Sequence, residues 1–109
     1  MTSAEEAMAS MNRAQALLVE VEADIERLAE VTAWLDEARL RVIGLYDYIR
    51  RSVADDIAVV LKHDPAAVTP PVANEDAAWE AVAEFDLGMQ RLLRIVTAQL
   101  TMSLDDTAR

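Results

Sequence analysis

Apolar residues recur every three or four positions along more than half of the chain. The series runs without interruption through Leu18, Val21, Ile25, Leu28, Val31, Leu35, Ala38, Val42, Leu45, Ile49, Val53, Ile57 and Val60. This spacing places the apolar side chains on one face of an α-helix. Thr2 or Ser3 can cap the start of the helix, and no proline interrupts it before Pro65. The pattern therefore predicts helix over about residues 3–62.

A single helix of that length is rare in a small domain. Gly44 is the one interior residue with a clear helix penalty, about 1 kcal/mol relative to alanine. We therefore expect either one long N-terminal helix or a helix pair, with a break within residues 30–52.

A proline-containing segment follows this region. Pro65 opposes continuation of the helix, and we expect a loop over residues 64–73. Asn74 can then cap a new helix, with Glu75 and Asp76 in its first turn, where negative charge is favourable. Apolar residues continue at near-heptad spacing through Ala78, Val82, Phe85, Met89, Leu92, Val96 and Leu100. These residues predict a C-terminal helix over about residues 75–103.

The composition agrees with an all-α protein. Of the 109 residues, 53% are hydrophobic, while only two are glycine, three are proline and five are aromatic. Such a composition favours helices over sheets and turns. We expect a single helical domain over residues 1–109, arranged as an antiparallel coiled-coil-like bundle.

The two predicted helical regions differ in length, and this difference bears on function. A C-terminal helix of about 30 residues can cover only about half of a 60-residue helix. Either the chain bends within residues 30–52 and forms a compact three-helix bundle, or the surplus apolar face packs on another subunit. In the second case the partner or oligomer interface would contain Leu18, Val21, Ile25, Leu28, Val31, Trp34 and Leu35.

The net charge of −10 indicates which classes of macromolecule the chain can bind. Nucleic-acid binding requires a basic footprint to contact phosphates, so we expect no direct binding to nucleic acid. An acidic surface can instead steer a small protein toward a basic partner.

The residue types needed for catalysis or metal binding are scarce. The chain has no cysteine and a single histidine, His63, and it lacks a glycine-rich phosphate loop or a nucleophile elbow. We therefore expect no enzyme activity, no cofactor and no metal site. The N-terminus lacks a basic start with an apolar run, and no stretch approaches ~18 unbroken apolar residues. We expect a cytoplasmic protein that does not enter a membrane.

The segment that starts the C-terminal helix has two interpretations. Glu75 and Asp76 favour helix initiation, and together with Trp79 they could also form a docking junction for a partner. Val72, Asn74, Glu75, Asp76 and Trp79 span the junction between a proline-containing loop and the final helix. In this arrangement the chain resembles the bacterial family labelled domain of unknown function 4298. That resemblance implies an all-helical fold, and the family has no established activity to transfer.

These observations favour a small acidic accessory or adaptor protein that acts by helix–helix contact with a protein partner and associates with itself. The alternative is an acidic inhibitor, such as a nucleic-acid mimic of the anti-defence or antitoxin-like type, that blocks a basic site on its partner.

Overall fold

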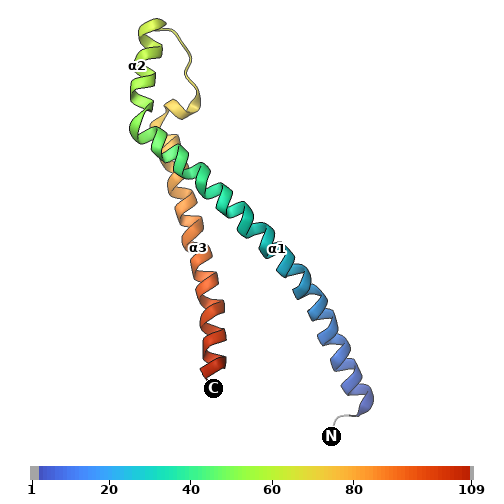
Figure 1. The fold of residues 1–109 in the computed structure, drawn as a ribbon. Helices are drawn as coiled ribbons and strands as arrows, with labels where there is room; N and C mark the ends of the chain where they lie inside the picture. The colour runs from blue at the N-terminus through green and yellow to red at the C-terminus, as the bar shows by residue number, and fades with distance from the viewer. Residues whose placement is uncertain (1–2, 109) are drawn as a thin grey trace. The chain divides into compact units, whose positions relative to one another are not determined.

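The protein is all-α. The computed structural model describes the backbone of residues 3–108 and, apart from Glu75 and residues 104–108, their side chains. Helix α1 covers Ala4–Arg51, α2 covers Val53–His63, the short 3₁₀ helix η1 covers Pro71–Ala73, and α3 covers Glu75–Ala108 (Figure 1). No strand occurs in this described part of the chain. The predicted fold class and the order of its elements are thus confirmed.

The start of α1 is fixed by Ser3. Its hydroxyl oxygen accepts a hydrogen bond from the amide of Glu6 at 3.1 Å, and its carbonyl accepts one from the amide of Ala7 at 2.9 Å. The first bond satisfies an amide that has no partner within the first turn of the helix, and the second is the first backbone hydrogen bond of the helix itself. Glu5 and Glu6 also place negative charge in this turn, where the helix dipole favours it.

The predicted break occurs at Ser52, between α1 and α2. Arg50 and Arg51 occupy the last turn of α1, and Asp55 and Asp56 occupy the first turn of α2. Basic residues at a helix C-terminus and acidic residues at an N-terminus are both favoured by the helix dipole, so the local charges suit two helix ends at this point. Gly44 lies within the uninterrupted part of α1. Its intrinsic penalty is therefore too small to stop the helix.

The loop and the last helix begin where the sequence predicts. Helix α2 ends at His63, and residues 64–70 lead into η1. The side-chain oxygen of Asn74 accepts a hydrogen bond from the amide of Asp76 at 3.1 Å, which caps α3. Helix α3 continues to Ala108, five residues beyond the predicted end at 103.

The chain divides into two compact units, Met1–Arg39 and Leu40–Arg109. The first, called here the N-terminal unit, contains only the first part of α1. Among its described residues 3–39, Ala38 alone is buried, and Val31 and Leu35 alone are half-buried. The second, called here the C-terminal unit, contains the end of α1, α2, η1 and α3.

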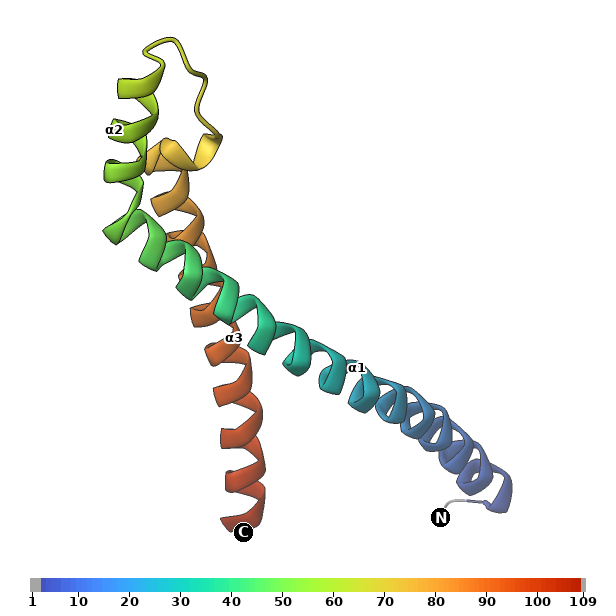
Figure 2. The same ribbon diagram turned by 45° about the horizontal axis from the view of Figure 1, so that its top comes forward.

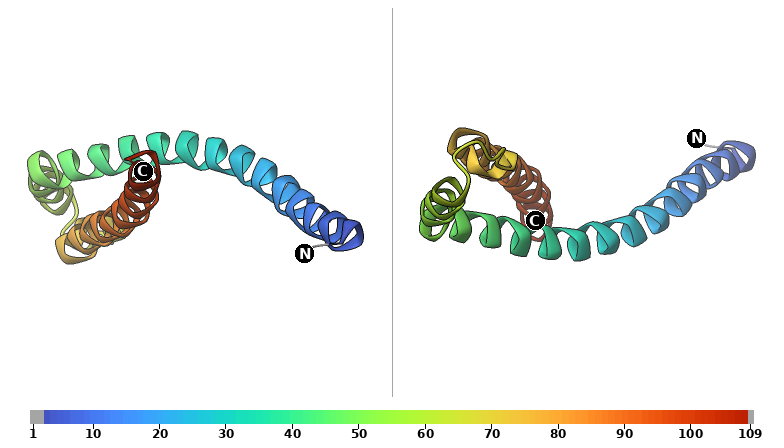
Figure 3. Two further views of the ribbon diagram at one scale, coloured as in Figure 1. Left: turned by 90° about the horizontal axis from the view of Figure 1, so that it is seen from below. Right: turned by 90° about the horizontal axis from the view of Figure 1, so that it is seen from above.

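The C-terminal unit holds a small hydrophobic core. The chain turns between α1 and α2, and the loop returns so that η1 contacts both α2 and α3 (Figures 2 and 3). Ile49, Val53 and Ala78 are buried at the centre of this arrangement. Around them pack the partly buried residues Leu45, Tyr48, Ile57, Val72 and Val82. Residues from all four helical elements therefore meet in one cluster.

We expect Ile49→Ala to destabilise the C-terminal unit much more than Ile43→Ala does. Both isoleucines lie in α1, but Ile49 is 5% exposed and Ile43 is 50% exposed. Removing a buried isoleucine side chain costs about 2 kcal/mol or more, whereas the exposed one loses little contact. Urea unfolding followed by circular dichroism, at one fixed protein concentration, measures the difference. Equal losses in the two variants would show that Ile49 does not lie in the core.

Candidate interaction surfaces

The N-terminal unit carries a continuous apolar face whose side chains are exposed. Leu18, Val21, Ile25 and Leu28 are between 50% and 62% exposed. The same spacing of three and four residues extends backwards to the start of the helix. We call the whole set the α1 stripe; it consists of Ala4, Ala7, Met11, Ala14, Leu18, Val21, Ile25 and Leu28, all of them exposed.

The spacing within the α1 stripe is that of a coiled coil. Its members alternate in steps of three and four residues, which corresponds to positions a and d of a heptad repeat over more than three heptads. Side chains at these positions insert between the side chains of a facing helix. The α1 stripe is therefore suited in geometry to pack lengthwise against another helix.

The predicted interface residues fall into two groups in the structure. Leu18, Val21, Ile25 and Leu28 belong to the exposed α1 stripe, and Trp34 is 54% exposed. Val31 and Leu35 are half-buried. The bare face thus ends at Leu28, and the uncovered surface lies closer to the N-terminus than the predicted set.

The predicted docking junction lies at the start of α3. Asn74 caps the helix by accepting a hydrogen bond from the amide of Asp76. The structure thus shows Asn74 at the start of this helix as its cap, and the docking junction stays a prediction. The side chain of Glu75 lies outside the described residues. Trp79 is 39% exposed and remains accessible to a partner.

Trp79 belongs to an aromatic group that the sequence does not predict. Its ring meets that of Tyr46 edge to face, with the centroids 5.4 Å apart and the planes at 85°. The guanidinium carbon of Arg50 lies 5.6 Å from the centroid of Tyr46, within the range of a cation–π contact. The ring contact joins the last part of α1 to the first part of α3, whereas the contact of Arg50 with Tyr46 lies within α1.

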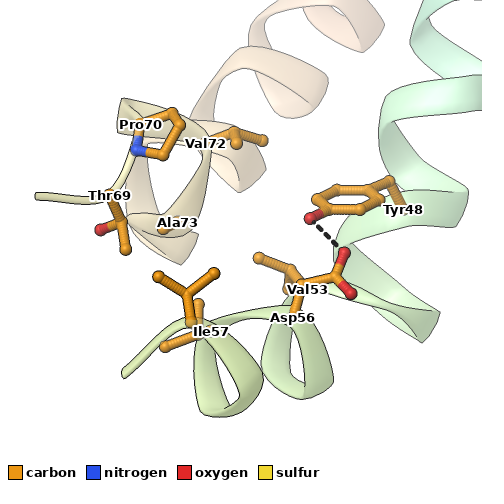
Figure 4. Close-up of a pocket in the computed structure, with 9 residues that line it drawn as sticks. Tyr48, Val53, Asp56, Ile57, Thr69, Pro70, Val72 and Ala73 are labelled. Carbon is orange, nitrogen blue, oxygen red and sulfur yellow. Dashed lines mark hydrogen bonds between the residues drawn. The ribbon is translucent and has the colours of Figure 1, made fainter. Parts of the chain in front are cut away.

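A hydrogen bond spans the break between α1 and α2. The hydroxyl of Tyr48 donates to Oδ2 of Asp56 at 2.7 Å (Figure 4). The two residues line a small pocket of about 90 Å³. The other lining residues are apolar except for Thr69; they are Val53, Ile57, Val60, Thr69, Pro70, Val72 and Ala73. Pockets for small-molecule ligands usually measure roughly 300–1,000 Å³, so this one has room for a small side chain or a few water molecules.

The same contact changes the acidity of Tyr48. Its hydrogen bond to Asp56 raises the pKa of the Tyr48 hydroxyl above 10.0, with smaller contributions from desolvation and from the negative charge of Asp56. Each cause favours the neutral phenol. The folded state therefore holds this proton more tightly than the unfolded state. The resulting stabilisation is present in full below pH 10 and is lost as the pH rises through the raised pKa.

The described residues show neither a group of side chains that could hold a metal ion nor a membrane-spanning helix. Among the described side chains, no three histidine, cysteine, aspartate or glutamate residues gather closely enough to hold a metal ion. No helix in the described part of the chain combines the length and the apolar character needed to cross a bilayer.

Comparison with protein-family models gives no match, and searches among curated proteins and among solved structures give none either. The proposals below therefore rest on the residues of this chain and their contacts.

Two features of these surfaces lie outside the sequence predictions. The N-terminal half of the α1 stripe has a signal in the sequence, because Ala4, Ala7, Met11 and Ala14 continue the heptad spacing once alanine is counted as apolar. No pattern in the sequence predicts the contact of Tyr46 with Trp79 or that of Tyr48 with Asp56. Both depend on how the chain turns after Arg51.

The pKa of Tyr48 can be measured with Tyr48 as the only tyrosine. In a Tyr46→Phe variant, we expect the absorbance of tyrosinate to give a midpoint above pH 10.0. Adding Asp56→Ala should lower that midpoint, because the acceptor of the hydrogen bond and its charge are both removed. Adding Asp55→Ala, a matched loss of a neighbouring carboxylate, should leave the midpoint nearly unchanged. If both additions shift it equally, the bond to Asp56 is not the cause.

Proposed function

We propose that this chain is a small helical accessory or adaptor protein that acts by helix–helix contact with other polypeptides, and that it associates with itself. The observation that carries the proposal is the α1 stripe, a coiled-coil face that is exposed from Ala4 to Leu28. The partner surface is a helix with a complementary apolar face.

The energetics of the α1 stripe favour a partner. Burying a Val, Leu or Ile side chain completely contributes roughly 1.5–3 kcal/mol relative to full exposure. The four Val, Leu and Ile members of the stripe, Leu18, Val21, Ile25 and Leu28, are between 50% and 62% exposed. Covering them would contribute on the order of 4 kcal/mol per copy. Most helical stability in proteins comes from packing of an apolar face rather than from intrinsic propensity. A partner helix would therefore also stabilise the N-terminal unit itself.

The charge of the chain supports a second candidate, the acidic inhibitor. A formal charge of −10 on 109 residues favours contact with a basic surface. Such a protein would bind through its carboxylates rather than through the α1 stripe. The exposed heptad face argues for the adaptor, because charge-driven contact does not need it.

The remaining proposals concern enzyme activity, cellular location and family. We propose no enzyme activity, and a cytoplasmic location is consistent with a cysteine-free chain. The resemblance to domain of unknown function 4298 stays a prediction, and it would add only an all-helical fold.

The test compares two substitutions that add the same charge to different faces of α1. Ile25→Asp places a carboxylate within the α1 stripe, whereas Val19→Asp places one outside it on the same helix. We expect the unmodified chain to be a dimer or larger at micromolar concentration by sedimentation equilibrium. Ile25→Asp should raise the dissociation constant at least about tenfold, and Val19→Asp should change it little, because only the first buries a charge in the interface.

Three outcomes would contradict the proposal or redirect it. A strictly monomeric chain would exclude self-association. Equal weakening by Ile25→Asp and Val19→Asp would show that charge repulsion, rather than the α1 stripe, controls assembly. If both variants bind a basic partner with unchanged or higher affinity, the result would redirect the proposal to the acidic inhibitor.

A further inference from the structure

We propose that the α1 stripe binds the α1 stripe of a second copy of this chain in antiparallel orientation. This inference rests on the proposed self-association and specifies its geometry. Two independent properties of residues 4–28 support it: the sizes of the side chains along the stripe, and the distribution of charge beside them.

Side-chain size changes along the α1 stripe. Its N-terminal half consists of Ala4, Ala7, Met11 and Ala14, and its C-terminal half consists of Leu18, Val21, Ile25 and Leu28. In a parallel pair, equal residues would face each other. Alanine would then meet alanine at one end, and leucine would meet leucine at the other. The two helices could pack closely at only one of these ends, because interaxial distance depends on the side chains at the contact.

The antiparallel pair matches each small residue with a large one. In the register that places Ala4 of one copy opposite Leu28 of the other, every a position of one copy faces a d position of the other. The four distinct layers join Ala4 to Leu28, Ala7 to Ile25, Met11 to Val21, and Ala14 to Leu18 of the second copy. Each layer then has a similar total volume, so the spacing between the helices stays constant. Even packing of this kind avoids both voids and overlaps.

Charge is also distributed unevenly along this helix. Residues 17–28 contain Glu20, Glu22, Asp24 and Glu26 with one base, Arg27, whereas residues 4–16 contain Glu5 and Glu6 with one base, Arg13. A parallel pair would place the two strongly acidic segments side by side. The antiparallel pair places each beside the weakly charged segment of the other copy, which lowers the repulsion between them.

In the same register, both bases lie at the axial level of acidic residues of the second copy. Arg13 falls at the level of Glu20 of the second copy, and Arg27 falls at the level of Glu5 and Glu6 of the second copy. In a parallel pair, Arg13 has no acidic residue within six positions on either chain. Side-chain size and charge therefore select the same orientation.

The natural absence of cysteine allows a direct test by thiol cross-linking. Single substitutions Ala7→Cys and Ile25→Cys are made in otherwise unmodified full-length chains. The variants are treated with a short bismaleimide, separately and after mixing, and the products are identified by mass. In the antiparallel pair, the thiol at position 7 of one copy faces the thiol at position 25 of the other. The two copies of position 25 lie 18 positions apart, about 27 Å at ~1.5 Å per residue.

We expect the mixture to give the cross-linked heterodimer in at least about tenfold excess over either homodimer. A second pair, Ala4→Cys with Leu28→Cys, repeats the test at the edge of the stripe and covers the case in which one substitution disturbs assembly. Efficient cross-linking of Ile25→Cys with itself would establish a parallel pair and overturn the orientation. A lack of cross-linking in both mixtures, with the unmodified chain dimeric by sedimentation, would overturn the orientation and leave self-association intact. A monomeric unmodified chain would overturn both.

Discussion

An α-helix with an apolar face needs another element to cover that face, because most helical stability in proteins comes from packing. This requirement organises the whole chain. In the C-terminal unit it is met internally, because α2, η1 and the start of α3 surround Ile49 and Val53 at the turn after Arg51. In the N-terminal unit it is not met between Ala4 and Leu28, where every described side chain is exposed. The adaptor proposal follows from this difference between the two units.

The chain thus combines a small internal core with an open helical surface. The core depends on few residues, and the contacts at its edge add to it: the Tyr46 and Trp79 rings meet at 5.4 Å, and Tyr48 bonds to Asp56 across the break. These contacts fix the path of the chain from α1 into α2 and α3. The α1 stripe has no comparable contacts among the described residues. Its side-chain spacing is nevertheless regular, which is expected of a surface that packs against another helix.

Much of the fold can be predicted from local sequence. Ser3, Pro65 and Asn74 mark helix ends through capping or through the geometry of proline, and each acts as predicted. The exact position of the break could not be predicted. Gly44 has the larger intrinsic penalty, yet the helix ends beside Ser52, where charges of opposite sign flank the turn and Ile49 and Val53 are buried on either side of it. Tertiary burial outweighs a propensity difference of about 1 kcal/mol.

The candidate surfaces were predictable to a smaller extent. The heptad spacing of Leu18 to Leu28 indicates an apolar face, and those residues are exposed in the structure. Their continuation to Ala4 is visible only when small residues are counted as part of the face. The meeting of Tyr46 with Trp79 joins residues 33 positions apart, and no local pattern encodes it.

Hydrogen exchange at several protein concentrations tests the central claim most directly, since it reports on each segment of the backbone separately. If a second polypeptide copy covers the α1 stripe, amides of residues 8–28 should become more protected as the concentration rises, whereas amides near Ile49 and Val53 should keep the same protection throughout. Protection of residues 8–28 that is already high at the lowest concentration, and does not change with dilution of a monomeric chain, would contradict the account.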